Sequence, residues 1–280
     1  MLSVLIPARN EAYLGATVAD VLRQARGEIE VIPVLDGYTH PLPDDPRVRP
    51  IAHATSQGMR PSINEAVLAA RGDVLLKCDA HCAFAEGFDV VLQTELADDW
   101  VVVPRRYDLD PETWTIGGEA RDAHYLMWPW HKPDVRPALR GRFWPARAAA
   151  RAACDLDDEM TSQGSCWVMR RAFWDRVIGP LDTVSYGPFV HEFQEVGLKA
   201  WLSGGRVKVN KRTSYGHWYK RHGQGYILSP RQSHQGIAYT LDHWLHDRWP
   251  ARRRNFAWLI EAFWPVPTWP ADPRDWIPSR

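Results

Sequence analysis

Residues 72–82 are the stretch that most constrains how this chain folds. A Gly-Asp turn opens it, and the apolar run at residues 74–76 is typical of a buried strand. The strand ends in an Asp-x-His tripeptide formed by Asp79 and His81. Residues two apart in an extended chain point to the same side, so the carboxylate and the imidazole converge. Because ligands bind at the carboxyl ends of strands in open α/β sheets, the stretch predicts a binding site there.

The pair Asp79 and His81 offers one oxygen ligand and one nitrogen ligand. This combination suits a divalent ion such as Mn²⁺, which also accepts phosphate oxygens. Two other interpretations stay open at this point. The pair also fits an ordinary strand end with two polar residues, and Cys78 and Cys82 beside His81 admit a zinc site. No second Cys/His pair at zinc-finger spacing follows in the sequence, which argues against zinc.

The first part of the chain follows a strand–helix–strand pattern. A buried strand at residues 3–7 precedes a helix expected over residues 14–24, and a second strand at residues 30–35 ends in Asp36. This order predicts a right-handed βαβ unit. An acidic residue at that strand end commonly contacts the ribose or base of a nucleotide, although a simple Asp-Gly turn is an alternative. Arg60, near the start of the next helix, is either a phosphate or pyrimidine ligand or a solvated arginine.

Several motifs of the first half together resemble the family-two glycosyltransferases. No one motif decides the resemblance, which rests on their order and spacing. The motifs are VLIPARNE at residues 4–11, Asp36-Gly37, Arg60 with Asn64-Glu65, and GDVLLKCD at residues 72–79. The resemblance implies a GT-A fold, which is an α/β, Rossmann-like nucleotide-sugar domain with a mostly parallel central sheet flanked by helices. It also implies a glycosyltransferase that uses a nucleotide-sugar donor.

The Asp-x-His form and three motifs of the second half are more similar to the polypeptide N-acetylgalactosaminyltransferases. GSCW at residues 164–167 looks like their acceptor-side turn, and HEFQEVGLKAWLSGG at residues 191–205 resembles their Gly-Gly-Glu-Asn-x-Glu helix. GHWYK at residues 216–220 resembles the segment that carries their third metal ligand. The resemblance extends over roughly residues 2–245. It implies that His217 joins Asp79 and His81 as a ligand of Mn²⁺ or Mg²⁺, although a lone His there also fits a structural residue.

The resemblance also implies which residues bind the donor, which is expected to be a UDP-sugar. The divalent ion would neutralise the leaving diphosphate. Asp36 and Arg60 would bind the nucleoside. The full set of expected nucleotide-sugar contacts is Pro7, Arg9, Glu11, Asp36, Arg60, Asn64, Asp79, Trp167 and Tyr219. Residues 219–233 contain several glycines and predict a mobile loop over this donor site, with a purely structural connector as the alternative.

Glu192 and Glu195 lie three residues apart on one helix face and are the candidate catalytic carboxylates. An inverting enzyme uses a carboxylate to take the acceptor proton, and family-two enzymes usually place Glu-Asp at this helix start. Here Phe193 stands where that Asp is expected, so the base is missing or displaced to Glu192. The N-acetylgalactosaminyltransferases are retaining and have Glu-Asn there. We therefore expect retention, with Glu192 binding sugar or acceptor, while Glu195 also fits a carboxylate that interacts with the helix dipole.

The chain divides into three expected parts. Residues 1–104 form the nucleotide-sugar half, residues 105–245 form the acceptor and catalytic half of the same GT-A domain, and residues 246–280 form a Trp/Pro-rich extension. The extension is expected to wrap the core as an irregular tail, because so much aromatic area rarely stays exposed. Residues 105–160 are expected to lie over the acceptor side. Within them, the acidic patch 155–159 is expected to be a solvated loop, with a metal or acceptor site as the alternative.

Residues 206–254 contain eleven lysines and arginines but only two acidic residues, Asp242 and Asp247. Tryptophans and tyrosines are interleaved with these cations. A basic stripe with aromatic residues suits a polyanion with stackable bases. The acceptor could then be nucleic acid, such as a hydroxymethylated base flipped from duplex DNA by a phage-type DNA-modifying enzyme. Alternatively, the cations bind the diphosphate and solvate a helix, and the acceptor is a Ser/Thr-bearing protein or a glycan.

Composition bounds the remaining possibilities. The chain has 280 residues, 45% of them hydrophobic, which suffice for a sizeable core, and its formal net charge of zero makes any charge argument local. The four cysteines fit a reducing compartment. The first strand leaves no room for a signal peptide, and no apolar run approaches membrane-spanning length. We therefore expect a cytoplasmic protein, acting in the host cytoplasm if it comes from a phage. The non-enzyme alternative is a catalytically degenerate binder of nucleotide-sugars or nucleic acid.

Overall fold

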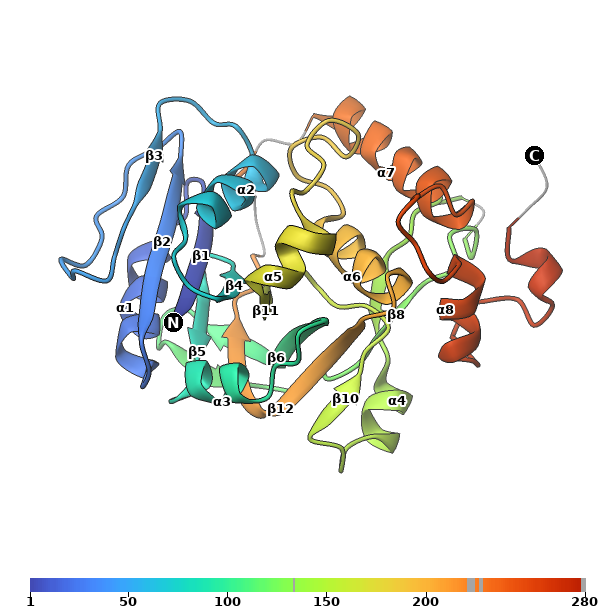
Figure 1. Ribbon diagram of the computed structural model, residues 1–280, viewed down its shortest axis with the longest axis horizontal. Coiled ribbons are helices and arrows are strands. Elements are labelled where there is room, and N and C mark those ends of the chain that lie inside the picture. The colour runs from blue at the N-terminus through green and yellow to red at the C-terminus, as the bar shows by residue number, and fades with distance from the viewer. Residues whose placement is uncertain (133, 221–224, 227–228, 278–280) are drawn as a thin grey trace.

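The computed structural model describes residues 1–132, 134–220, 225–226 and 229–277. Its centre is a ten-stranded sheet with helices packed against it (Figure 1). From one edge to the other the strands are β10 (Leu156–Asp158), β12 (Arg206–His217), β6 (Trp100–Asp110), β11 (Cys166–Arg170), β4 (Val74–Cys78), β1 (Leu2–Ala8), β2 (Ile29–Asp36) and β3 (Ile51–His53). Two short strands complete this sheet, β5 (Cys82–Phe84) beside β12 and β7 (Thr115–Gly117) beside β6. A separate two-stranded sheet pairs β8 (His124–Leu126) with β9 (Gly141–Phe143).

Parallel pairing dominates the N-terminal part of the sheet. β1 runs parallel to both β2 and β4, and β2 runs parallel to β3. β12 and β6 form a further parallel pair, whereas β11 between β4 and β6 is antiparallel to both. The expected α/β class with a mostly parallel central sheet is therefore confirmed. The parallel order brings the carboxyl ends of β1, β2 and β4 to the same edge of the sheet.

Helices cover the sheet and extend beyond it at the C-terminal end (Figure 1). They are α1 (Leu14–Gln24), α2 (Met59–Ala69), α3 (Phe88–Thr94), α4 (Pro145–Ala150), α5 (Arg171–Phe173), α6 (Glu192–Leu202), α7 (Pro230–Leu245) and α8 (Phe256–Ala262). A π-helical turn at Trp174–Ile178 and a 3-10 turn at Pro273–Asp275 complete the set. α2 packs on β1 and β2, and α6 packs on β6 and β12.

The burial pattern explains why the first strands and α1 form where the sequence predicts them. Every residue of β1 and of β2 is buried, as expected for strands of a parallel sheet that is covered on both faces. α1 buries Leu14, Val18 and Val21 at helical spacing, so one apolar stripe of the helix faces the core. The predicted bounds of this helix, residues 14–24, are those of α1.

β12 is longer than its sequence indicates. The sequence alone predicts a strand only over residues 206–209, where apolar and basic residues alternate, but β12 runs from Arg206 to His217. Its middle is polar, and the pairing with β6 is irregular between Asn210 and Ser214. Asn210 is nonetheless fully buried and donates a 2.7 Å hydrogen bond to Glu95. A buried polar residue with a distant partner interrupts the apolar alternation from which a strand is predicted. The predicted strand therefore ends before β12 does.

The acidic segment 155–159 is not the solvated loop that its composition predicts. It contains β10, which pairs with β12, and the side chains of Asp157 and Glu159 are buried. Asp157 forms an ion pair of 2.8 Å with Arg151, and Glu159 lies 2.6 Å from Nδ1 of His124. Each buried acid therefore has a hydrogen-bonding partner, as burial of a polar group requires. These contacts form only in the folded chain. They allow a hydrophilic segment to become a strand of the sheet.

The aromatic C-terminal region packs onto the body of the protein, as expected, but it is not wholly irregular because it includes α8. Trp269 and Trp276 are buried. The indole of Trp269 donates a 2.7 Å hydrogen bond to the carbonyl of Leu126 in β8, and Trp128 donates one of 3.0 Å to the carbonyl of Trp276. Among the described residues, no helix combines the length and the apolarity that a membrane crossing needs.

Candidate active site

A cavity of about 440 Å³ opens where the ends of β1, β4 and β12 meet the start of α6. We call it the triad cavity, after the three residues described next. Carboxylates, imidazoles and a lysine line it together with aromatic side chains. The predicted site residues among its lining are Pro7, Glu11, Asp79, His81, Glu192, His217 and Tyr219. The cavity therefore collects motifs from both halves of the chain at the edge where the sequence predicts a site.

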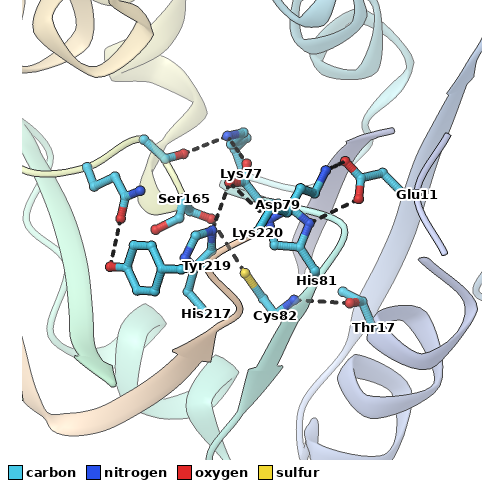
Figure 2. Close-up of polar contacts among 12 residues, drawn as sticks. Glu11, Thr17, Lys77, Asp79, His81, Cys82, Ser165, His217, Tyr219 and Lys220 are labelled. Atoms are coloured by element: carbon cyan, nitrogen blue, oxygen red, sulfur yellow. Dashed lines mark hydrogen bonds and ion pairs between the residues drawn. The ribbon is translucent and has the colours of Figure 1, made fainter. Parts of the chain in front are cut away.

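Asp79, His81 and His217 converge on one point in this cavity (Figure 2). One ligand atom from each residue lies within 4.8 Å of the other two. Oδ2 of Asp79 lies 3.3 Å from Nε2 of His217 and 3.9 Å from Nε2 of His81. One carboxylate oxygen and two imidazole nitrogens form a donor set that suits Mn²⁺ and similar divalent ions. The three residues, hereafter the triad, therefore fit a metal site.

Strand pairing places the triad. Asp79 directly follows β4, and His81 directly precedes β5. His217 is the last residue of β12 and pairs across the ladder with Cys82, the first residue of β5. The pairing of β5 with β12 therefore sets His217 beside the Asp-x-His tripeptide, although 138 residues separate His217 from Asp79.

Burial and neighbouring side chains set the protonation states of His217 and Asp79 that metal binding requires. Burial lowers the pKa of His217 to about 4, so its imidazole is neutral near pH 7. Burial alone would raise the pKa of Asp79, but the charge of Lys77 and contacts with both histidines hold it well below its usual value. Nδ1 of His81 lies 3.1 Å from the carboxylate of Glu11, which orients the ring. Glu11 in turn pairs with Lys220 (Figure 2).

Lys77 is a site residue that the motif analysis did not single out. Its Nζ is buried and donates hydrogen bonds of 2.7 Å to Oδ1 of Asp79 and 2.6 Å to the carbonyl of Gly164. A third contact, of 3.2 Å, reaches Glu192. Burial opposes the charge of Lys77, but the two carboxylates outweigh it and raise the pKa of the amine. One signal was present in the sequence, because a lysine inside the apolar run of a buried strand needs a counter-ion.

The two candidate catalytic glutamates have different surroundings. Glu192 lines the triad cavity, where its carboxylate contacts Lys77 and accepts a hydrogen bond from the indole of Trp167. Burial raises the pKa of Glu192 despite these contacts. Glu195 is buried outside the cavity lining and forms ion pairs with Arg60 and Lys199. The structure therefore brings only Glu192 to the triad.

Arg60 occupies neither of the two predicted environments. Its side chain is fully buried, and it pairs with Glu195. Its guanidinium also donates to the carbonyls of Val190, at 2.7 Å, and Asp182, at 3.2 Å, and lies over the ring of Tyr186. With these contacts the guanidinium fastens α2 to the segment before α6 and to α6 itself. A phosphate or pyrimidine ligand and a solvated arginine are both inconsistent with this position.

Asp36 is also fully buried, and protein groups occupy its carboxylate. It accepts hydrogen bonds from Ser56 and from the backbone amides of Gln57 and Gly58, and it lies 2.7 Å from Nδ1 of His53. Burial would raise its pKa, but these bonds hold the pKa below its usual value. The carboxylate therefore organises the loop after β3 in this structure. The predicted contact of Asp36 with a nucleoside would require that network to rearrange.

Of the remaining residues predicted to bind the nucleotide-sugar, one lines the cavity and three contact other protein groups outside its lining. Arg9 donates a 2.7 Å hydrogen bond to the carbonyl of Asp36, and Asn64 exchanges two hydrogen bonds with the backbone of Leu181. Trp167 is fully buried and reaches the site only through Glu192. Tyr219 lines the cavity, and its ring packs against that of His217.

The segment predicted to be a mobile loop is described only in part. Residues 221–224 and 227–228 lie outside the described residues. Gly225 and Tyr226 line the triad cavity, and α7 already begins at Pro230, so the end of the predicted loop is helical.

Comparison with known proteins places this geometry in a family. The family model described as "Glycosyl transferase family 2" matches residues 3–177, which is more than half of the chain. The chain belongs to glycosyltransferase family 2. The predicted family is therefore confirmed. No curated protein sequence matches the chain.

Solved structures confirm the GT-A fold of the transferase. GalNAc-T7 with UDP, GalNAc and Mn²⁺ is 16% identical with a TM-score of 0.68, over 88% of this chain and 49% of that chain. TarS residues 1–349 of S. aureus with UDP-GlcNAc are 16% identical with a TM-score of 0.56, over 92% and 69%. The mannosyltransferase PcManGT of Pyrobaculum calidifontis, with GDP-Man and Mn²⁺, is 13% identical with a TM-score of 0.51, over 93% and 74%. The transferase thus spans about half the length of the GalNAc-T7 chain.

Proposed function

We propose that the transferase moves a sugar from a UDP-sugar to a hydroxyl group, with a divalent cation held by Asp79, His81 and His217. The observation that carries the proposal is the convergence of three ligand atoms within 4.8 Å in the cavity. The relatives add support, since GalNAc-T7 was solved with UDP and Mn²⁺ and TarS with UDP-GlcNAc. Mn²⁺ and Mg²⁺ are the candidate ions, because both accept carboxylate and phosphate oxygens.

In the proposed reaction the oxygen of the acceptor hydroxyl forms a bond to the anomeric carbon of the sugar. The bond between that carbon and the β-phosphate oxygen of UDP breaks, and UDP leaves with the electron pair. When bound, the cation supplies Lewis-acid stabilisation to the leaving diphosphate. Glu11 and Lys77 hold His81 and Asp79 in place, and Tyr219 packs against His217.

We also propose that transfer proceeds with retention of configuration. Three carboxylates are found in the described lining of the triad cavity, those of Glu11, Asp79 and Glu192. Each contacts a lysine, which stabilises the charged carboxylate and so disfavours its use as the base that an inverting enzyme needs. In a retaining, front-side transfer the leaving phosphate oxygen takes the hydroxyl proton instead. NMR of the product at the first turnover distinguishes the two outcomes, because inversion would make Glu192 the base.

The test of donor use is UDP release from a panel of UDP-sugars in the presence of Mn²⁺. We expect release with at least one donor and its loss in Asp79→Ala and His217→Ala. Exposed His234, which does not line the cavity, supplies the matched control His234→Ala. Release that survives both triad substitutions would refute the role of the cation.

A catalytically degenerate binder is the second candidate. It is favoured by Phe193, which is buried where family-two enzymes usually have an Asp. This candidate predicts that UDP binds in the presence of Mn²⁺ but that no donor is turned over. Calorimetric binding of UDP, measured beside the release assay, separates the two functions.

The acceptor that we propose is polyanionic, with hydroxymethylated bases in DNA as the first example to test. The basic stripe at 206–254 does not support it as one surface, because carboxylates neutralise much of it: Arg206 and Lys208 pair with Asp158, Arg212 with Glu95 and Asp155, Lys220 with Glu11, and Arg248 with Asp242. Arg221 lies outside the described residues.

Support for a polyanion comes instead from a second cavity. Ser/Thr of a protein and a glycan are the alternative acceptors, and mass spectrometry of each after incubation with mixed UDP-sugars separates them.

A further inference from the structure

A second cavity, of about 840 Å³, adjoins the triad cavity. Its walls come from β6, from the β8–β9 hairpin and from the loop that joins these two strands. Four residues line both cavities: His124, Gly141, Gln163 and Tyr219. A ligand in the second cavity would therefore lie directly beside the proposed site of sugar transfer.

The lining of the second cavity is strongly cationic, and we call it the arginine cavity. Six lysine and arginine side chains line it: Arg106, Arg121, Lys132, Arg136, Arg140 and Arg142. His124 and His131 line it as well, and no acidic residue is found among its described lining. Asp134, in the same loop, is exposed and is not part of the lining. Clustered like charges repel one another, so the cluster costs stability unless an anion compensates it.

Most of these cations have no protein anion to bind. The side chains of Lys132, Arg136, Arg140 and Arg142 form no ion pair or hydrogen bond with any described residue, whereas most cations of the basic stripe are paired. Arg121 has one counter-charge, Asp108, at 3.5 Å. A guanidinium group that is not paired with a carboxylate can donate two parallel hydrogen bonds to a phosphate.

Buried donors at the back of the cavity also lack partners. Arg106 is only 3% exposed, and its terminal nitrogens contact Gln163 at 2.8 Å and His124 at 2.6 Å. Its Nε has no hydrogen-bond partner among the described residues, and neither has Nε of Arg121. Buried polar groups normally have partners, so unpaired guanidinium donors indicate that a ligand supplies them.

A short chain of contacts joins the arginine cavity to the triad. Gln163 accepts hydrogen bonds from Arg106, at 2.8 Å, and from the hydroxyl of Tyr219, at 3.1 Å. The ring of Tyr219 packs against that of His217 with 4.6 Å between centroids, and the guanidinium of Arg121 lies over the Tyr219 ring, 5.3 Å from its centroid. Tyr219 thus contacts both a cation of the arginine cavity and a triad residue.

We propose that the arginine cavity binds a phosphate group of the acceptor and so presents the hydroxyl of a phosphate-bearing acceptor to the triad cavity. This inference rests on the proposed glycosyl transfer for its role, but the binding of phosphate can be tested without turnover. The proposed anion-binding surface is therefore the arginine cavity at the β8–β9 hairpin, and not the basic stripe. A phosphodiester of nucleic acid and a small phosphorylated polyol offer the same group to these arginines.

The first experiment measures binding of inorganic phosphate to the full chain by phosphorus NMR, with and without saturating UDP and Mg²⁺. We expect wild-type protein to bind phosphate in both conditions, with an affinity that falls as salt rises. The double variant Arg140→Gln/Arg142→Gln should bind at least about tenfold more weakly, because it removes two charge-assisted donors. Neither side chain bonds to a described residue, so the melting temperature should not fall.

The matched control is Arg71→Gln. It removes an exposed cation that precedes β4, whereas the triad lies at the other end of this strand. Equal phosphate affinity in wild-type protein and the double variant, or no binding at all, overturns the proposal. Failure of the proposed function looks different: no UDP-sugar would be turned over, while phosphate would still bind to the wild type and only weakly to the double variant.

A second experiment identifies the source of the phosphate. Transfer is compared between a hydroxymethylcytosine oligonucleotide and the neutral nucleoside, and between glycerol 3-phosphate and glycerol. We expect the phosphorylated member of a pair to be preferred by wild-type protein and by Arg71→Gln, and the preference to be lost in the double variant. A neutral acceptor used equally well by all three proteins would contradict the proposal. Preference for the oligonucleotide over the phosphorylated polyol would assign the phosphate to nucleic acid.

Discussion

Nε2 of His217 lies 3.3 Å from Oδ2 of Asp79, across 138 residues of sequence. The contact forms because the last residue of β12 pairs with the first residue of β5, immediately after the Asp-x-His tripeptide. The proposed chemistry depends on this pairing, since one residue of register shift would turn His217 to the other face of the sheet.

Removing a triad side chain should weaken metal binding without unfolding the transferase. His217→Ala is expected to bind Mn²⁺ at least about tenfold more weakly, because even residues that only orient ligands contribute that much. Titration calorimetry measures the effect, and a melting curve with added Mn²⁺ should show a smaller shift than wild type. His234→Ala is the control. Unchanged affinity in His217→Ala would remove this residue from the site.

Lys77 should be needed for both stability and activity. Lys77→Met leaves Asp79 and Glu192 buried without their cation, and breaking a buried pair in this way costs about 3–5 kcal/mol. Chemical denaturation measures the loss. The double variant Lys77→Met/Glu192→Gln should recover part of the stability, because one uncompensated carboxylate is gone, but none of the UDP release. Full activity in the double variant would show that Lys77 serves the fold alone.

The sequence predicts the parts of the site that depend on local pattern. The Asp-x-His tripeptide marks the site correctly, but Ala80 and His81 form a turn between β4 and β5, so this turn and not strand alternation brings Asp79 and His81 together. His217 required the resemblance to a family, because no local pattern distinguishes it from a structural histidine. Lys77 needed a partner 115 residues away, on the first turn of α6, and no periodicity encodes that distance.

Charge was the least predictable property. The basic stripe is dense in sequence, yet its carboxylate partners come from distant segments around residues 95 and 155–158. The arginine cavity shows the reverse case. Its cations are spread from Arg106 to Arg142 with no periodicity, and only the hairpin brings them together. Local charge density therefore does not indicate which cations remain available for a ligand.

Glu195 should act through stability and not through catalysis. Glu195→Gln removes the charge that compensates buried Arg60, so we expect a loss of about 3–5 kcal/mol in the free energy of unfolding. The KM for the donor should stay near the wild-type value at a temperature where the variant is folded. Glu192→Gln gives the contrast, with a fall in turnover expected because Glu192 lines the triad cavity. A large fall in kcat in folded Glu195→Gln would restore Glu195 to the catalytic machinery.

His53 should make the transferase less stable as pH rises above neutral. Its ring joins Asp36, at 2.7 Å, to Glu65, at 2.6 Å. Burial would lower the pKa of His53, but the hydrogen bonds and charges of these two carboxylates raise it above its usual value of 6.5. The folded state therefore holds a proton that the unfolded state releases. The stabilisation is complete below pH 6.5 and is lost as pH rises through the raised pKa of the folded state.

The measurement is the free energy of unfolding of wild type and His53→Gln between about pH 6 and about pH 9. The difference between the two proteins should shrink as pH rises. Burial lowers the pKa values of His124, His191 and His217, so their contributions are lost only as pH falls below 6.5. Both proteins contain these histidines, so their contributions cancel in the difference. A difference that is constant or grows with pH would mean that His53 is not protonated in the folded protein. The neutral ring would then donate its single N–H to only one of the two carboxylates, Asp36 or Glu65.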